Sequence, residues 1–160
     1  MEILDWLNNS ISGEFVFTMI MSMLPVVELR GGIPFGVSMG LSMPAAVLAS
    51  IIGNMLPVPF LILFTRRVFE WLRVHIPRLD KFVTAMENKA NSNMAVVKKY
   101  RFWGLMILVA IPLPGTGAWT GALVAAIMNL RLKKSFPAIF LGVIIAAVIV
   151  SLITLGVISI

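Results

Sequence analysis

The order of apolar and polar positions divides the chain into long apolar stretches at residues 15–27, 31–65, 102–130 and 135–160. An α-helix needs about 20 residues to cross a hydrocarbon core about 30 Å thick. Residues 135–160 carry no charge and have Pro137 only near their start, so we expect them to cross as one helix. Residues 45–65 are also long enough, although Pro57 and Pro59 predict a kink in their later half.

The other two regions are interrupted by residues that break helices. Residues 15–43 contain the string E-L-R-G-G-I-P at 28–34, where the glycines and Pro34 favour unwinding. Residues 102–130 contain P-L-P-G-T-G at 112–117, and two prolines and two glycines in six residues cannot continue a regular helix. Each arm of the first region is about 20 Å long, which reaches the middle of a bilayer without crossing it. Each region is therefore either a kinked crossing helix or a re-entrant hairpin whose ends lie on one side.

The distribution of charge favours the hairpins. Nine of the thirteen lysines and arginines lie between Arg66 and Arg101, and basic clusters beside apolar segments are typical of cytoplasmic loops. With this loop in the cytoplasm, four crossing helices would place Arg131, Lys133 and Lys134 outside and the acidic N-terminus inside, against the positive-inside rule. Two hairpins and two crossing helices instead place these basic residues inside and both chain termini outside.

The sequence thus predicts an all-α integral membrane protein with a single membrane domain built as an inverted repeat. Each repeat is a re-entrant helical hairpin followed by a transmembrane helix, an arrangement that many transporters use to build a site at mid-membrane. The predicted segments are an interfacial helix at 1–12, hairpin 1 at 15–43, a transmembrane helix at 45–65, a basic cytoplasmic loop at 66–101, hairpin 2 at 102–130 and a transmembrane helix at 135–160.

Apolar residues recur at helical spacing within the basic loop, between lysines and a glutamate. This pattern predicts an amphipathic helix over Arg78–Lys99, with Pro77 setting its start. Such a helix either lies on the inner leaflet or connects the membrane segments and packs against them.

Composition supports a membrane protein and excludes several functions. Of the 160 residues, 59% are hydrophobic and 12% are charged, and this charged fraction is about half that of ordinary soluble domains. The basic loop accounts for most of the basic residues behind the net charge of +6, so this charge does not indicate nucleic-acid binding. The chain has no cysteine and only one histidine, His75, and its sequence contains no nucleophile–base or metal-binding constellation. We expect no enzymatic activity, no cofactor and no metal.

Glu28 and Arg30 are the only charged residues between positions 16 and 64, and hairpin 1 would hold both near mid-membrane. A charge at that depth costs about 2.5–3.5 kcal/mol on insertion scales, so something must offset it. Burial and the neighbouring arginine change the proton affinity of Glu28 in opposite directions, so small movements would drive proton uptake and release there. Arg30 suits an anion such as phosphate. The alternative is that the two residues form a locking ion pair, or cap the hairpin tip, without touching substrate.

Broken helix ends around Gly31 and Gly115 would add backbone N–H groups to the same space. The alternative for hairpin 2 is a turn whose small residues merely let the two hairpins approach. The candidate substrate- or proton-binding residues are Glu28, Arg30, Gly31, Gly32, Pro34, Pro112, Pro114, Gly115, Thr116 and Gly117, with Asn54, Trp119 and Arg131 as secondary candidates.

The strings E-L-R-G-G-I-P and P-L-P-G-T-G, with Gly53-Asn54 between them, resemble the bacterial and archaeal family of small multidrug export proteins. That family is similar to the wider DedA and VTT-domain superfamily, which implies two re-entrant hairpins facing each other. DedA proteins are thought to translocate polyprenyl-phosphate carriers or to use proton gradients, and Glu28 would match the acidic residue of their first hairpin. They also have functional arginines in the second hairpin, whereas this chain has none between Phe102 and Leu130, and Arg131 is the nearest.

Three functions follow from these patterns and from the resemblance. The first is a transporter that exports small lipophilic or charged compounds, coupled to protons through Glu28, with alternating access between the hairpin halves. The second is a DedA-like translocase of polyprenyl-phosphate or phospholipid, and the third is a non-transporting membrane scaffold. The expected partners are the lipid bilayer, a small-molecule or lipid substrate and a second copy of the chain in a homodimer. The expected location is the prokaryotic cell membrane, crossed more than once.

Overall fold

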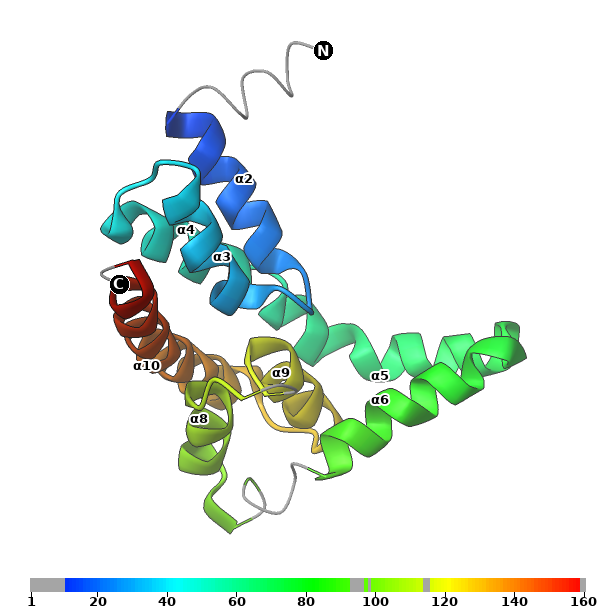
Figure 1. The fold of residues 1–160 in the computed structure, drawn as a ribbon. Coiled ribbons are helices and arrows are strands. Elements are labelled where there is room, and N and C mark those ends of the chain that lie inside the picture. Colours follow the sequence, from blue (N-terminus) through cyan, green and yellow to red (C-terminus); the bar gives the residue numbers. More distant parts are fainter. Residues whose placement is uncertain (1–10, 93–96, 98, 114–115, 159–160) are drawn as a thin grey trace. The chain divides into compact units, whose positions relative to one another are not determined.

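The computed structural model of the chain describes residues 11–92, 97, 99–113 and 116–158. This part of the chain is helical and contains no β-strand, as the apolar pattern predicts. Its elements are α2 (Ile11–Met23), α3 (Glu28–Ser38), α4 (Met43–Met55), α5 (Val58–His75), the 3-10 turn η1 (Pro77–Leu79), α6 (Asp80–Ser92), α8 (Phe102–Ala110), α9 (Ala118–Ile127) and α10 (Leu132–Ile158) (Figure 1). The interfacial helix predicted at 1–12 falls almost wholly outside the described residues.

Two helical segments are long and apolar enough to cross a membrane. One is Met43–His75, which comprises α4 and α5, and the other is Leu132–Val157 within α10. They correspond to the crossing helices predicted at 45–65 and 135–160. The first is interrupted at Leu56–Pro57, where α4 ends and α5 begins, because proline cannot donate a helical hydrogen bond. The helix is thus irregular at Pro57, one of the two prolines from which a kink is predicted.

The chain divides into two compact units, which are described separately. Unit 1 comprises residues 1–56 and 143–160, and unit 2 comprises residues 57–142. The boundaries fall at the break between α4 and α5 and within α10.

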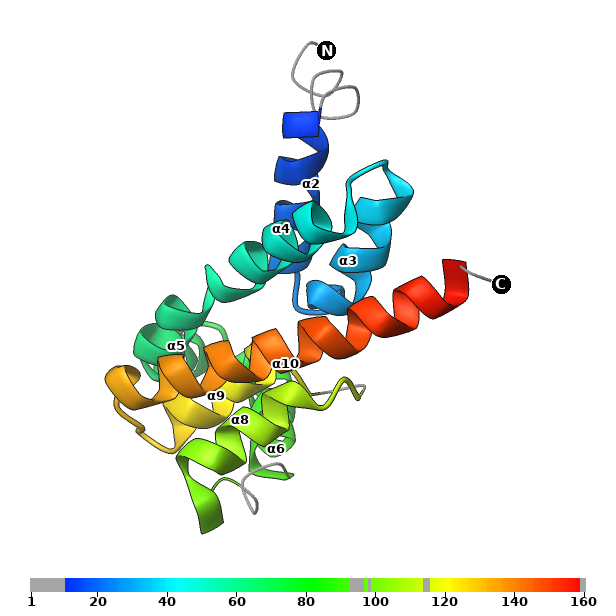
Figure 2. The same ribbon diagram turned by 90° about the vertical axis from the view of Figure 1, so that its left-hand side faces the viewer.

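Unit 1 is built around three short helices that pack on one another, α2, α3 and α4. A turn at residues 24–27 joins α2 to α3, and the two helices then lie side by side (Figures 1 and 2). The helix α3 ends at Ser38 and is followed by Gly40, whose φ of 106° is accessible mainly to glycine. The Gly40 and Leu41 N–H groups donate to the Val37 and Gly36 carbonyls at 3.0 and 3.1 Å, which is the Schellman pattern. This tight ending lets α4 begin three residues later and pack back on the pair.

The break predicted at residues 28–34 is wrong. Gly31, Gly32 and Pro34 all lie inside α3, and the chain instead turns at residues 24–27, around Pro25. Close packing explains the difference, because Gly32 and Gly36 lie against α2 and α4 without side chains to separate the helices. The stabilisation from this packing outweighs the cost of about 1 kcal/mol that each glycine imposes on a helix.

Unit 2 is arranged around α9, which packs against α5, α6 and α8. Residues 111–113 and 116–117, between α8 and α9, are not helical, so the predicted interruption is confirmed there, while Pro114 and Gly115 lie outside the described residues. The C-terminal end of α9 has the same hydrogen-bond pattern as that of α3. Asn129 has a φ of 54°, and the Asn129 and Leu130 N–H groups donate to the Ala126 and Ala125 carbonyls at 3.1 and 2.9 Å.

The predicted basic loop is mostly helical. The helix α5 continues through its basic residues to His75, and α6 then returns to pack on α9. Arg73 of α5 forms ion pairs with two acids of α6, Asp80 at 3.2 Å and Glu87 at 2.6 Å. Val83 and Ala90 of α6 are fully buried. The packing supports the connecting-helix alternative for this segment, while attachment to a lipid surface stays a prediction.

Candidate functional site

Glu28 is the buried acid of unit 1. It is the first residue of α3, directly after the turn, and only 4% of its surface is exposed. Its φ of 49° lies in the left-handed region, which costs a residue with a side chain about 1–3 kcal/mol and is concentrated at functional sites. The Glu28 N–H nevertheless donates to the Leu24 carbonyl at 2.9 Å. The turn therefore holds a carboxylate in the protein interior at a local conformational cost.

Arg30 follows Glu28 on the same helix and is half-buried. The two opposite charges interact electrostatically, as the sequence predicts, although the residues lie on a regular helix rather than on an unwound segment. Gly31 also belongs to α3, and a Cβ there would meet the side chain of Val27 in the preceding turn at 2.6 Å. Pro34 lies one turn further and cannot donate the helical hydrogen bond to the Arg30 carbonyl.

Gly32 brings two hydroxyl groups together inside unit 1. A Cβ at Gly32 would overlap the Ser22 Oγ of α2 and lie 2.8 Å from the Ser50 Oγ of α4. One turn later, a Cβ at Gly36 would lie 2.9 Å from the Thr18 Oγ1. The missing side chains thus leave room for hydroxyl groups from both neighbouring helices.

The four polar residues Thr18, Ser22, Ser50 and Asn54, here called the polar column, are completely buried. The Ser22 hydroxyl donates to the Thr18 carbonyl at 2.8 Å. Among the residues that the structure describes, the Thr18 Oγ1, the Ser50 Oγ and both polar atoms of the Asn54 amide have no hydrogen-bond partner. Each buried polar group without a partner costs about 1–3 kcal/mol, so four such atoms in one small unit indicate a site that handles polar species.

The helix register relates this column to Glu28. Along α4, Ala46 lies against Gly36 and Ser50 lies against Gly32. Extending this register by four residues on each helix predicts that Asn54 lies near Glu28. On that register, the polar column from Thr18 to Asn54 ends at the level of the buried carboxylate.

The candidate residues of hairpin 2 lie in unit 2. The Thr116 hydroxyl lies 2.7 and 2.8 Å from the carbonyl oxygens of Ile111 and Leu113. The backbone N–H of Thr116 donates to the Leu113 carbonyl at 3.1 Å. Gly117 has a φ of 121°, just before α9 begins. Thr116 therefore folds this segment back on itself, and Gly117 supplies a backbone conformation that other residues rarely adopt. Pro112 is half-buried in the same segment.

The secondary candidates lie in three different places. Asn54 belongs to the polar column. Trp119 lines an apolar pocket of about 390 Å³ between α5, α6 and α9, with Phe60, Phe64 and Phe82 among its neighbours. Arg131 lines a separate pocket in unit 2, near the start of α10.

Thr18, Ser22 and Ser50 are functional candidates that the sequence does not single out. Their signal is the spacing of four between Thr18 and Ser22 on one helix and between Ser50 and Asn54 on another, which places each pair on one helix face. Among the described residues, no group of three or more histidine, cysteine, aspartate or glutamate side chains could hold a metal ion.

A protein-family model described as "Putative small multi-drug export protein" matches residues 28–149. Comparison with curated proteins and with solved structures gives no match. The matched region includes α3 with Glu28 and Arg30, the segment between α8 and α9, and most of α10. Together with the two long apolar helical segments, this match indicates a membrane protein.

Proposed function

Because the chain belongs to the family of small multi-drug export proteins, we propose that it exports small lipophilic or charged compounds and that protons bound at Glu28 drive the transport. The observation that carries the proposal is a buried carboxylate in the same unit as the polar column, in which Thr18, Ser50 and Asn54 have buried polar atoms without a partner among the described residues. A carboxylate in such surroundings changes its proton affinity when its surroundings change. Ionisable groups inside membrane segments commonly mark ion or proton pathways.

Glu28, Arg30 and the polar column have separate roles in this proposal. Glu28 binds and releases the proton. Arg30 sets the proton affinity of Glu28 through its positive charge. The hydroxyl groups and the Asn54 amide stabilise the charged or polar species that passes, because they exchange hydrogen bonds with it inside an otherwise apolar unit.

We further propose that α2–α3 and α8–α9 are re-entrant. As far as the structure describes them, the four helices have 13, 11, 9 and 10 residues, so none of the described helices exceeds about 20 Å in length. That length is short of the roughly 30 Å of a hydrocarbon core. The relation to the DedA superfamily is part of the same proposal.

Equivalent close contacts in the two units support an internal repeat. A Cβ at Gly121 of α9 would lie 2.5 Å from the Val109 Cγ2 of α8 and 3.5 Å from the Ile139 Cγ1 of α10. Gly121 lies 89 positions after Gly32, and Ile139 lies 89 positions after Ser50. In both units, a glycine of the second hairpin helix thus approaches the first hairpin helix and the long helix that follows.

A second pair of glycines repeats the pattern. A Cβ at Gly53 of α4 would overlap the Met19 carbonyl oxygen of α2, and a Cβ at Gly142 of α10 would lie 2.7 Å from the Met106 carbonyl oxygen of α8. Gly142 again lies 89 positions after its counterpart, and each methionine lies four residues before the end of its helix. These pairs support a common three-helix unit.

Cysteine labelling tests the proposed topology. Because the chain has no natural cysteine, single cysteines at positions 8 and 133 would be labelled one at a time in intact cells with a membrane-impermeant maleimide. We expect position 8 to react from outside and position 133 to react only after the membrane is opened. Labelling of position 133 alone in intact cells would support four plain crossings.

Substitution of Glu28 tests proton coupling. In proteoliposomes with an imposed pH gradient, we expect the wild-type chain to transport ethidium with counter-movement of protons, followed with a trapped pH dye. Glu28→Gln preserves the side-chain shape but cannot ionise, so gradient-driven transport should fall at least about 10-fold. Glu70→Gln, at an exposed position on α5, is the matched control and should transport normally.

The outcome separates the proposed functions. Gradient-driven transport by Glu28→Gln at the wild-type rate would overturn the role of this residue. No transport of any tested dye by the wild-type chain, with normal folding, would instead favour the scaffold alternative.

A further inference from the structure

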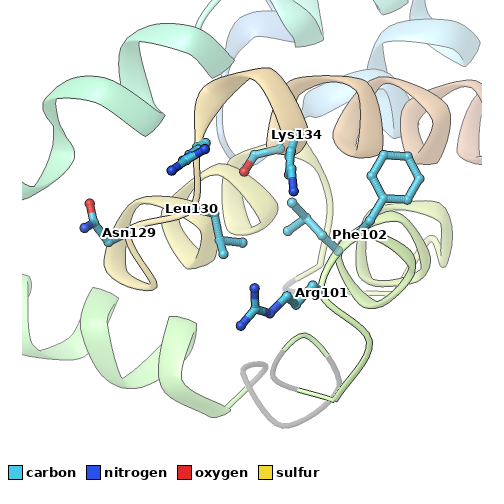
Figure 3. A pocket seen from close by; sticks show the side chains of 8 residues that line it. Arg101, Phe102, Asn129, Leu130 and Lys134 are labelled. Atoms are coloured by element: carbon cyan, nitrogen blue, oxygen red, sulfur yellow. The ribbon is translucent and has the colours of Figure 1, made fainter.

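A pocket of about 490 Å³ in unit 2 is lined by basic side chains from two separate parts of the chain. Arg101 immediately precedes α8, while Arg131 and Lys134 lie at the start of α10. Figure 3 shows Arg101 and Lys134 entering this space from different segments, with Leu130 between them and Phe102 to one side. The pocket volume lies within the range of about 300–1,000 Å³ that is typical of sites for small ligands.

The described residues that line this pocket carry positive charges without an acidic side chain among them. Arg73 forms ion pairs elsewhere in the described part of the chain, and no ion pair described there involves Arg101, Arg131 or Lys134. Three cations around one concave surface repel one another and concentrate a positive potential inside it. An anion in the pocket would remove this repulsion.

A buried hydroxyl group also faces the pocket without a partner. Ser135 lines the pocket, its surface is only 1% exposed, and its Oγ has no hydrogen-bond partner within the described part of the chain. Arg101, on the other side, has a φ of 42°, which is a strained conformation for a residue with a side chain. The unpartnered hydroxyl is independent evidence for a polar ligand, because it would donate to an anion that the cations attract.

Apart from Asn129, the remaining lining residues are apolar. Phe102 is half-buried, Leu105 is only 1% exposed, and Leu130 is half-buried beside them. The pocket thus combines a cationic part with an apolar part, which suits a phosphate group that carries a hydrocarbon chain.

We propose that this pocket binds a phosphate group, either as the headgroup of an anionic lipid or as free phosphate. Two guanidinium groups offer planar donor pairs that match phosphate oxygens, an ammonium adds a point charge, and the Ser135 hydroxyl adds a fourth donor. A single carboxylate has only two oxygens and would leave some of these donors without partners. The pocket lies in unit 2 and uses none of the residues proposed to couple protons in unit 1, so the proposal goes beyond export through Glu28.

Binding measurements on the full chain in detergent test the proposal. The probes are inorganic phosphate, dioctanoyl phosphatidic acid and dioctanoylglycerol, which lacks the phosphate, and binding is followed by titration calorimetry. We expect the phosphatidic acid to bind and dioctanoylglycerol not to bind. The double variant Arg101→Gln/Lys134→Gln should weaken binding more than 10-fold. Ser135→Ala, which leaves the net charge unchanged, should weaken it about 10-fold, as expected for a lost hydrogen bond to a charged group.

A matched charge control separates a built site from general attraction. Arg78→Gln/Lys81→Gln also removes two positive charges, but from exposed positions in η1 and α6. This control variant should change the affinity less than about 3-fold. Each variant is first checked for wild-type elution and helix content. Pocket-dependent binding of inorganic phosphate as tight as that of phosphatidic acid would identify free phosphate as the ligand, and tighter binding of the lipid would identify a lipid headgroup. Equal losses in the pocket and control variants, or equal binding of dioctanoylglycerol, would overturn the proposal.

Discussion

A single methyl group added at Gly53 is expected to lower the free energy of unfolding by about 3 kcal/mol, the upper part of the range for overpacked interiors. The methyl group of Gly53→Ala would overlap the Met19 carbonyl oxygen of α2. A backbone oxygen cannot rotate aside as a side chain can, so α2 and α4 must separate. That separation would also loosen the packing around Ser22 and Ser50, which lie between the same helices.

Reversible unfolding of the purified chain in mixed micelles, followed by far-UV circular dichroism, measures this loss. Gly156→Ala is the control, since a Cβ at Gly156 of α10 would meet no atom within 4 Å. That substitution should be neutral or slightly stabilising, because alanine is the better helix former. Equal stability of Gly53→Ala and Gly156→Ala would show that α2 and α4 do not pack as closely as described.

The parts of the fold that the sequence predicts depend on local chemistry. The two long apolar segments satisfy a length requirement that any crossing helix must meet, and both occur as predicted. The interruption before α9 follows from Pro112 and Gly117, because proline lacks an N–H donor and Gly117 adopts a φ of 121°. Neither outcome depends on which other segment packs nearby.

The break at residues 28–34 could not be predicted correctly because its outcome depends on tertiary contacts. Glycine in a helix usually signals weakness, but Gly32 and Gly36 allow α3 to approach two other helices closely. Pro25 carried the signal for the actual turn, since the residue before a proline disfavours helical conformation. The string at 28–34, with Glu28, Gly31 and Gly32, indicates the right region but the wrong backbone conformation.

The candidate site is predictable to a similar degree. Glu28 stands out because a lone acid in a long apolar stretch is costly, and it is indeed buried. A serine or threonine in such a stretch is common and carries little information alone. Thr18 and Ser50 become informative only when the register between α2, α3 and α4 is known, because that register brings them to the same glycine-lined space.

Replacing Asn54 with valine is expected to stabilise the protein and to impair its function. Asn54 is fully buried, and neither its Oδ1 nor its Nδ2 has a hydrogen-bond partner among the described residues. Removal of these polar atoms should raise the free energy of unfolding by about 1–2 kcal/mol. If the amide serves transport next to Glu28, the same change should lower proton-driven ethidium transport at least about 10-fold. Opposite changes in stability and activity are typical of residues retained for function.

The repeat supplies the control for this prediction. Val143 of α10 lies directly after Gly142, as Asn54 lies directly after Gly53, and it is fully buried. The reverse substitution, Val143→Asn, should lower the free energy of unfolding by about 2 kcal/mol or more, since it buries an amide in apolar surroundings. Both variants are measured by unfolding in mixed micelles and by the vesicle assay. A loss of stability in Asn54→Val would mean that the amide holds the fold together, and full transport activity in that variant would remove the polar column from the proposed pathway.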